Sequence, residues 1–298
     1  MDKSSLVSVI IPTYNHADFI REALESLCAQ TYENWEAIVV NNFSEDNTVE
    51  VVASFGDSRI RLENFHNHGV IAASRNHAIS LAKGDFLAFL DSDDTWFPEK
   101  LERCIAAFDE EVDLVCHGLR SFGDGPTYDF FGGPESKSTF DALLYEGNCL
   151  TPTSTVVRRE CVVTVNGFTE DVDKITTEDY HLWIKLAKAD VKMKFIRVVL
   201  GMYRIHAANQ SGSVIKNLDA IFAVTEDFYP TVGSRSLLDL ARIRRRRCLA
   251  YYSSVRALQK MGQHGDAWNM LTNAWGSWPF YYKIYIALAL NVYALLGR

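Results

Sequence analysis

Three aspartates follow one another closely at the end of an apolar run. The segment FLAFLDSDDTWFP, residues 86–98, places Asp91, Asp93 and Asp94 directly after five apolar residues. Carboxylates this close repel one another unless a cation, a proton or bulk water relieves the repulsion. Oxygen ligands suit Mg²⁺ or Mn²⁺, which bridge carboxylates to substrate phosphates. The spacing therefore indicates a metal and diphosphate site, with a solvated acidic turn as the alternative.

A second acidic pair, Glu178 and Asp179, begins the segment EDYHLWIKLAK. Its apolar spacing predicts a helix over 176–189, so both carboxylates lie in a first helical turn. Acids in that position stabilise the helix dipole. A carboxylate can also serve as a general base. Taken alone, this pair leaves both roles open.

The first 120 residues alternate short apolar runs with amphipathic patterns. Strands are expected at 6–14, 35–42, 59–65, 86–90 and 113–118. Helices are expected at 18–30, from the N-cap Ser44 to Gly56, up to Gly84, and after Pro98. This alternation predicts an α/β fold with a parallel sheet covered on both faces.

Polar residues follow several of the predicted strands. Besides the aspartates, Thr13, Tyr14 and Asn15 end the first strand, and Asn41 and Asn42 end the second. In open α/β sheets ligands bind beyond the carboxyl ends of the strands. We expect these loops to converge on one crevice.

The pattern changes after residue 120. A strand is expected at 151–157, and 191–206 alternates like an antiparallel or edge strand pair, whereas the chain reads as helical from about residue 216. We therefore predict a catalytic domain over 1–215 and a helical C-terminal region over 216–298.

Composition narrows the class of protein. The 298 residues are 48% apolar, enough for a large core, and the net charge of −8 argues against a nucleic-acid partner. The cysteines form no CxxC pair, and the N-terminal residues lack a signal-sequence pattern. These features predict a cytoplasmic protein.

The C-terminal region is basic and then apolar. Arg244 to Arg247 form a basic run, and residues 284–296 are apolar apart from Asn291. That stretch is shorter than the roughly 20 residues that span a bilayer. Peripheral contact with an anionic membrane surface, at the inner face of the cytoplasmic membrane, is one expectation. A helix docked on the core or on a second subunit is the other.

Several motifs together resemble a known family. VSVIIPTYN, IVVNNFSEDNT, NHGVIAASRNHAI, AKGDFLAFLDSDDTWFPEKL and TEDYHLWIKLA occur in this order between about residues 5 and 210. They resemble an inverting family 2 glycosyltransferase of the GT-A fold, which has a Rossmann-like, mixed and mainly parallel sheet flanked by helices. The resemblance implies transfer of a sugar from a nucleotide diphosphate donor, with UDP favoured, to a glycan or lipid-linked oligosaccharide acceptor. It also implies Mn²⁺ or Mg²⁺ as cofactor.

The resemblance assigns roles on the donor side. Pro12 and Tyr14 would flank the nucleotide base, Arg75 would face the diphosphate, and Asp91 would lie near the ribose or sugar. Asn42 stands where the family usually has an aspartate that meets the base edge. An amide both donates and accepts hydrogen bonds, whereas a carboxylate only accepts, so this departure bears on how uracil is read.

The remaining roles concern metal and base. Asp93 would be a metal ligand, with His206 as a second contact to metal or diphosphate and Arg204 adding charge. Asp179 would be the catalytic base, supported by Glu178. Trp183 reads equally as a core residue or as an acceptor platform.

Two other functions fit parts of the sequence. A haloacid-dehalogenase-type phosphohydrolase would use Asp91 as nucleophile and Asp93 as acid/base, although no suitably placed lysine or later acid pair accompanies them. A non-catalytic nucleotide-sugar-binding module would explain Asn41 and Asn42. The donor sugar, the acceptor, the choice between Mn²⁺ and Mg²⁺ and the oligomeric state stay open from spacing alone.

Overall fold

One mixed sheet forms the centre of the protein. The computed structural model describes residues 5–206, 213–230 and 232–296. In these residues nine strands have the order β3-β2-β1-β4-β8-β6-β9-β5, with β7 paired to β6. The strands are β1 Val7–Thr13, β2 Trp35–Asn41, β3 Ile60–Asn64, β4 Phe86–Phe89, β5 Thr95–Trp96, β6 Leu114–Gly123, β7 Asp129–Phe131, β8 Thr155–Arg158 and β9 Met193–Ile205.

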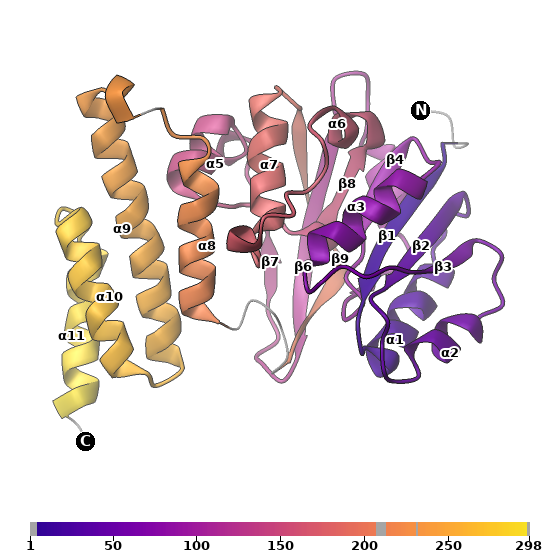
Figure 1. Ribbon diagram of the computed structural model, residues 1–298, viewed down its shortest axis with the longest axis horizontal. Helices are drawn as coiled ribbons and strands as arrows, with labels where there is room; N and C mark the ends of the chain where they lie inside the picture. The colour runs from indigo at the N-terminus through magenta and orange to yellow at the C-terminus, as the bar shows by residue number, and fades with distance from the viewer. Residues whose placement is uncertain (1–4, 207–212, 231, 297–298) are drawn as a thin grey trace.

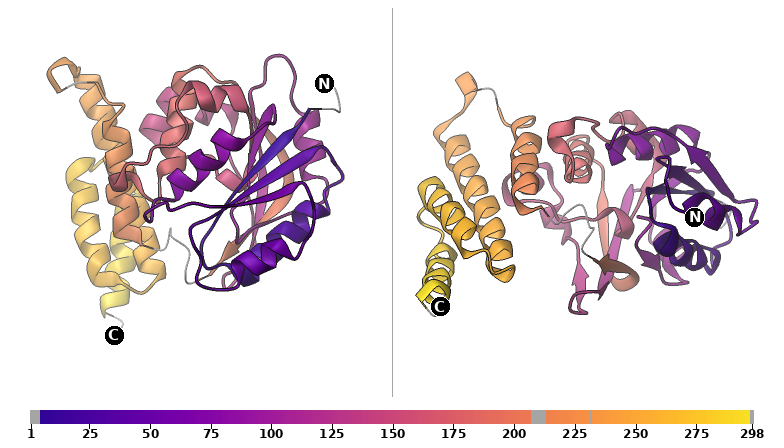
Figure 2. Two further views of the ribbon diagram at one scale, coloured as in Figure 1. Left: turned by 45° about the vertical axis from the view of Figure 1, so that its right-hand side comes forward. Right: turned by 60° about the horizontal axis from the view of Figure 1, so that its bottom comes forward.

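Helices cover both faces of this sheet, as Figures 1 and 2 show. The helices of the first 190 residues are α1 Ala17–Cys28, α2 Thr48–Ala53, α3 Ile71–Leu81, α4 Lys100–Ala106, α5 Phe140–Glu146, α6 Arg159–Thr164 and α7 Glu178–Lys188, with short 3-10 turns at Glu135–Lys137, Pro152–Ser154 and Val172–Lys174. Val9 and Ile11 pack with α1, α2 and α4, whereas Ile10 packs with α3 and α7. The two-residue period of a strand sends alternate side chains into these two cores. The predicted α/β fold is confirmed.

The sheet topology brings the polar strand ends together. β3, β2, β1 and β4 are parallel, and β1 lies between β2 and β4 with Val7 opposite both Trp35 and Phe86. Their carboxyl ends therefore share one edge of the sheet. β9 runs parallel to β6 and also pairs antiparallel with β5. Because β5 directly follows Asp91, Asp93 and Asp94, this pairing places the end of β9 near these aspartates.

Three expectations about elements were wrong. The strand expected at 151–157 begins only at Thr155, because Pro152–Ser154 form a 3-10 turn. The segment 191–206 contains one long strand, β9 (Met193–Ile205), and not a pair, because Gly201 continues the β6 pairing without a turn. The helix expected from Ser44 begins only at Thr48, with Asn47 at its N-cap. The Ser44 hydroxyl instead donates to Asn41 Oδ1 at 2.6 Å and accepts from the Asn15 backbone at 2.8 Å, so it joins two strand-end loops.

The C-terminal region is helical, as expected. It contains α8 Val214–Glu226, a 3-10 turn at Val232–Ser234, α9 Leu237–Lys260, α10 His264–Ser277 and α11 Lys283–Leu296. Figure 1 shows α9 to α11 at the end of the molecule opposite β3, with α8 between them and the sheet. α9, α10 and α11 share a hydrophobic cluster, whereas Val224 of α8 joins the core beneath α7. The domain boundary near residue 215 stays a prediction.

Candidate active site

The three aspartates after β4 have different surroundings. Asp94 is 1% exposed, and its carboxylate accepts hydrogen bonds from Thr153 Oγ1 at 2.5 Å and from the Arg204 backbone N–H at 2.8 Å. Burial, together with the charges of Asp93 and Asp91, raises the pKa of Asp94 well above its ordinary value. Asp94 therefore ties the turn to β9 and to the segment before β8. Asp91 and Asp93 keep partial exposure.

Arg75 links the end of β4 to the start of α7. Its guanidinium donates through Nη2 to Asp91 Oδ1 and through Nη1 to Glu178 Oε1, both at 2.7 Å. The Arg75 side chain is 4% exposed. Burial acts to lower the pKa of Arg75, but the carboxylates of Asp91 and Glu178 overcome it and raise that pKa. A charged guanidinium thus holds two acids that are far apart in the sequence.

Asp179 lies beside this ion-pair triad, in the first turn of α7. Burial, followed by the charge of Glu178, raises the pKa of Asp179 from its ordinary 3.8 to about 7. The charge of Arg75 acts in the opposite direction and does not cancel the effect. A carboxylate that titrates near neutral pH is suited to accepting a proton from a hydroxyl during a reaction.

Asp93 and His206 also meet, although 113 positions separate them in the chain. His206 Nε2 lies 3.0 Å from Asp93 Oδ2, and Arg204 Nε donates to the Asp93 backbone oxygen at 2.8 Å. His206 follows the last residue of β9, so the sheet pairing sets this contact. The residues expected to touch a metal ion are therefore neighbours.

The donor set at Asp93 fits a divalent cation that arrives with a ligand. Its side chain is 17% exposed and that of His206 is 11% exposed, so both remain reachable from solvent. The described residues contain no group of three or more His, Cys, Asp or Glu side chains that could hold a metal ion. Mg²⁺ and Mn²⁺ commonly use one or two protein ligands together with phosphate oxygens and waters, and an imidazole favours Mn²⁺ of the two.

The residues expected to meet a nucleotide base lie at the ends of β1 and β2. Tyr14 is 48% exposed, one turn residue beyond the strand, whereas Pro12 is buried inside β1 opposite Val40. Asn42 Oδ1 accepts from the Asn67 backbone N–H at 3.0 Å. This bond leaves the Asn42 amide nitrogen as the group that can donate to a ligand. The base-binding roles of these three residues stay predictions.

The site contains other residues that the sequence analysis did not single out. His16 Nδ1 lies 2.8 Å from Ser92 Oγ, and its ring centroid is 6.1 Å from that of His206. The position of His16, just after the strand-end residues Tyr14 and Asn15, could have indicated its place in the site. Thr153, which binds Asp94, gave no local signal. Trp183 is fully buried, which identifies it as a core residue and removes the acceptor-platform alternative.

Comparison with known proteins identifies the family. The model of glycosyl transferase family 2 matches residues 8–163, which include the strand-end loops described above. The chain belongs to this family. The glycosyltransferase is also 33% identical to WfgD and 34% identical to WfaP of Escherichia coli. Both are named UDP-Glc:alpha-D-GlcNAc-diphosphoundecaprenol beta-1,3-glucosyltransferases. The matches cover 75% and 72% of this chain and 86% and 82% of the relatives.

Solved structures agree with the fold of the glycosyltransferase. S. aureus TarS 1-349 in complex with UDP-GlcNAc has a TM-score of 0.60 at 19% identity, covering 98% of this chain and 92% of that one. The mannosyltransferase PcManGT from Pyrobaculum calidifontis, in complex with GDP-Man and Mn²⁺, has a TM-score of 0.62 at 18% identity, with coverages of 97% and 84%. At these identities the likeness concerns the fold alone.

Family membership also decides between the functions considered from sequence. The protein is a glycosyltransferase, so neither a phosphohydrolase nor a non-catalytic binding module describes it. The geometry agrees, because Asp91 is engaged by Arg75 and is not a free nucleophile.

Proposed function

We propose that this glycosyltransferase moves a sugar from a nucleoside diphosphate donor to an acceptor hydroxyl, with inversion at the anomeric carbon and Asp179 as base. One observation carries the proposal: Arg75 binds both Asp91 and Glu178, which sets Asp179 beside the acids at the end of β4. An inverting transfer is a single displacement and needs a base next to the donor site. The pKa of Asp179 near 7 supports this role.

The proposed step is a single displacement at the anomeric carbon. The acceptor oxygen forms a bond to the anomeric carbon while the bond between that carbon and the diphosphate oxygen breaks. The electron pair leaves with the nucleoside diphosphate, and the acceptor proton passes to an Asp179 oxygen. Glu178 stays charged in its ion pair with Arg75 and so keeps Asp179 basic. Asp93 and His206 are the residues that would hold Mn²⁺ or Mg²⁺, which when bound supplies positive charge to the departing diphosphate.

UDP-glucose is the first donor to test, because the names of WfgD and WfaP specify UDP-Glc. Their acceptor, a GlcNAc carried on diphosphoundecaprenol, makes a lipid-linked saccharide the first acceptor class. Tyr14 and the Asn42 amide are the groups we assign to the base of the nucleotide. A uracil carbonyl can accept a hydrogen bond from that amide nitrogen.

A lipid-linked acceptor agrees with the exposed surface of the C-terminal helices. α11 buries only Ile284, Ala287 and Asn291, and its other faces are largely apolar and exposed. The Asn291 side chain is fully buried and donates to the His264 backbone oxygen at 3.0 Å, which fixes how α11 is turned. We propose that this apolar face binds peripherally at the inner face of the cytoplasmic membrane.

The structure changes one part of that membrane hypothesis. Arg246, in the middle of the basic run, is 5% exposed and packs beneath α7, so it cannot reach lipid headgroups. Arg244, Arg245 and Arg247 are exposed. Among the helices of the described chain, none has both the length and the apolar character needed to cross a bilayer.

The test uses a donor panel with purified protein, Mn²⁺ and a GlcNAc-diphospholipid. We expect UDP release and a hexose added to the lipid only with the matching UDP-sugar. Asp179→Asn should reduce transfer on the order of 1,000-fold or more while Mn²⁺-dependent UDP binding persists, because the base acts only in the transition state. Normal transfer by Asp179→Asn, or retention of configuration in the product, would rule out the proposed mechanism.

A further inference from the structure

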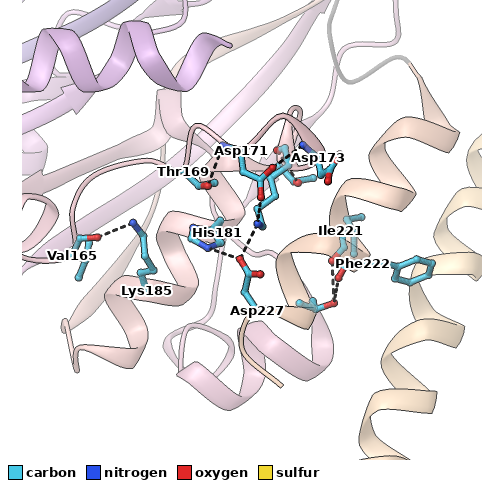
Figure 3. A network of polar contacts seen from close by, with 12 residues as sticks. Val165, Thr169, Asp171, Asp173, His181, Lys185, Ile221, Phe222 and Asp227 are labelled. Carbon is cyan, nitrogen blue, oxygen red and sulfur yellow. Dashed lines mark hydrogen bonds and ion pairs between the residues drawn. The ribbon is translucent and has the colours of Figure 1, made fainter. Parts of the chain in front are cut away.

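The end of α8 contacts both sides of the segment that carries Asp179. Asp227 follows the last residue of α8, and its Oδ2 lies 2.9 Å from Lys174 Nζ and 3.2 Å from His181 Nε2. Figure 3 shows the Asp227 carboxylate beside the His181 ring. Lys174 precedes the pair Glu178-Asp179 and His181 follows it. A single carboxylate from the C-terminal region therefore spans the start of α7.

The partners of Asp227 are well buried. Lys174 is 7% exposed and His181 is 9% exposed. Burial, with the charge of Lys185, lowers the pKa of His181 to about 4. At neutral pH His181 is thus uncharged and donates its Nε2–H to Asp227. Lys174 also donates to Asp171 Oδ2 at 2.5 Å, so two carboxylates hold its ammonium group.

A second contact from the C-terminal region supports the same turn. Tyr180 Oη donates to the Leu143 backbone oxygen at 2.5 Å, and the buried Arg246 of α9 places Nη2 at 3.4 Å from that hydroxyl. On the opposite side, Glu178 is fixed by Arg75. The first turn of α7 is therefore held from the donor side at Glu178 and from the C-terminal helices at Tyr180 and His181.

The segment before α7 needs such support. Thr176 has a φ of 81°, a left-handed conformation that is rare for a β-branched residue. Strained backbone persists only where the surrounding contacts hold it in place. Lys174 precedes Thr176 in the sequence and His181 follows it, and the side chains of both contact the Asp227 carboxylate.

We propose that Asp227 is a positioning residue, which fixes the turn between Lys174 and His181 and thereby aims the Asp179 carboxylate at the acceptor hydroxyl. This inference rests on the proposed role of Asp179 as base. It gives the C-terminal helices a part in catalysis that is separate from membrane binding. Within the described residues the side-chain contacts of Asp227 are with Lys174 and His181 and not with the donor side, so its loss should affect the rate of transfer and not donor binding.

Three variants of the full chain test the proposal. Asp227→Ala should lower kcat by about 10-fold to 100-fold, since small misplacements of a catalytic group have effects of this size. Its Kd for UDP with Mn²⁺ should stay within about twofold of the unchanged protein, as expected for an interaction used only in the transition state. The kcat of Asp227→Asn should lie between that of Asp227→Ala and that of the unchanged protein, because the amide oxygen still accepts from His181 and Lys174. The control is Glu226→Ala at a half-exposed neighbouring site. It removes ion pairs with Arg235 and, at 3.9 Å, with Arg247, neither of which touches α7, and should keep full kcat.

A second readout is hydrogen exchange of the peptide 171–181, which does not depend on knowing the acceptor. The proposal predicts faster exchange there in Asp227→Ala and in Asp227→Asn, but not in Glu226→Ala. Unchanged exchange, an unchanged kcat, or equal losses of kcat and UDP affinity would overturn it. If the unchanged protein transfers no sugar, the proposed function fails, and the exchange measurement still decides whether Asp227 fixes the turn.

Discussion

Asp93 and Asp94 show how neighbouring residues of one type take different roles. Asp94 is buried and bound to Thr153 and Arg204, so its oxygens are occupied by the protein itself. Asp93 keeps one carboxylate oxygen beside His206 at the surface of the site. We therefore propose Asp93 as the acid that would contact a metal ion.

Replacing Asp93 by Asn tests this assignment. We expect normal folding, a loss of transfer on the order of 100-fold, and UDP binding that no longer increases with Mn²⁺, because a charged oxygen ligand is replaced by a neutral amide. Isothermal titration of UDP with and without Mn²⁺ measures the effect. Asp109→Asn, at an exposed position outside the candidate active site, is the matched control. Full Mn²⁺ dependence in Asp93→Asn would mean that the metal ligand lies elsewhere.

At the scale of elements, the first turn of α7 holds the Asp179 carboxylate in surroundings that disfavour its negative charge. Its first turn offers a favourable dipole to acids, yet burial and the charge of Glu178 raise the pKa of Asp179 to about 7. Between pH 4 and 7 the folded state keeps a proton that the unfolded chain releases. The free energy of unfolding therefore falls as pH rises through this window.

The Asn variant at position 179 should remove that dependence. At pH 8 the unchanged protein carries a negative charge on the partly exposed Asp179 beside Glu178, so Asp179→Asn should raise the Tm. At pH 5, where Asp179 is mostly protonated in the folded state, the difference should shrink. Thermal unfolding across this pH range checks the prediction. A lower Tm for the variant at pH 8 would show that the dipole interaction outweighs burial and repulsion.

For the molecule as a whole, the membrane hypothesis now depends mainly on α11. Leu290 and Tyr293 are 46% and 80% exposed, so Leu290→Glu with Tyr293→Glu should leave the fold intact. We expect this variant to lose co-sedimentation with anionic vesicles, because charges on the apolar face oppose insertion. Added salt should weaken the part of the binding that comes from the exposed Arg244, Arg245 and Arg247, whereas the buried Arg246 adds nothing to it.

Leu238→Glu is the control, because it adds a charge at a leucine of α9 that is 67% exposed. It should bind vesicles as well as the unchanged protein. The α11 variant should also lose transfer to an acceptor in vesicles while retaining Mn²⁺-dependent UDP binding. Equal vesicle binding by both variants would instead favour a subunit interface or another surface.

The sequence alone determined the features that depend on local pattern. Alternating apolar runs and helical spacing predicted the α/β fold, and the motifs around Asp91, Asp93 and Asp179 predicted the family that the comparison confirmed. Strand ends are local features as well, so the loops after β1, β2 and β4 were found. The length of β9 and the start of α2 were not, because strand pairing and the Ser44 contacts between loops overrode local propensity.

Only the tertiary structure decided which distant residues meet. Arg75 reaches Glu178 across 103 positions, His206 reaches Asp93 across 113, and Asp227 reaches Lys174 from beyond the predicted catalytic domain. The tertiary structure also shows that Arg246 is buried, whereas the local sequence predicted a surface charge. Burial and proximity come from the packing of helices on the sheet. For that reason the raised pKa of Asp179 cannot be read from a motif.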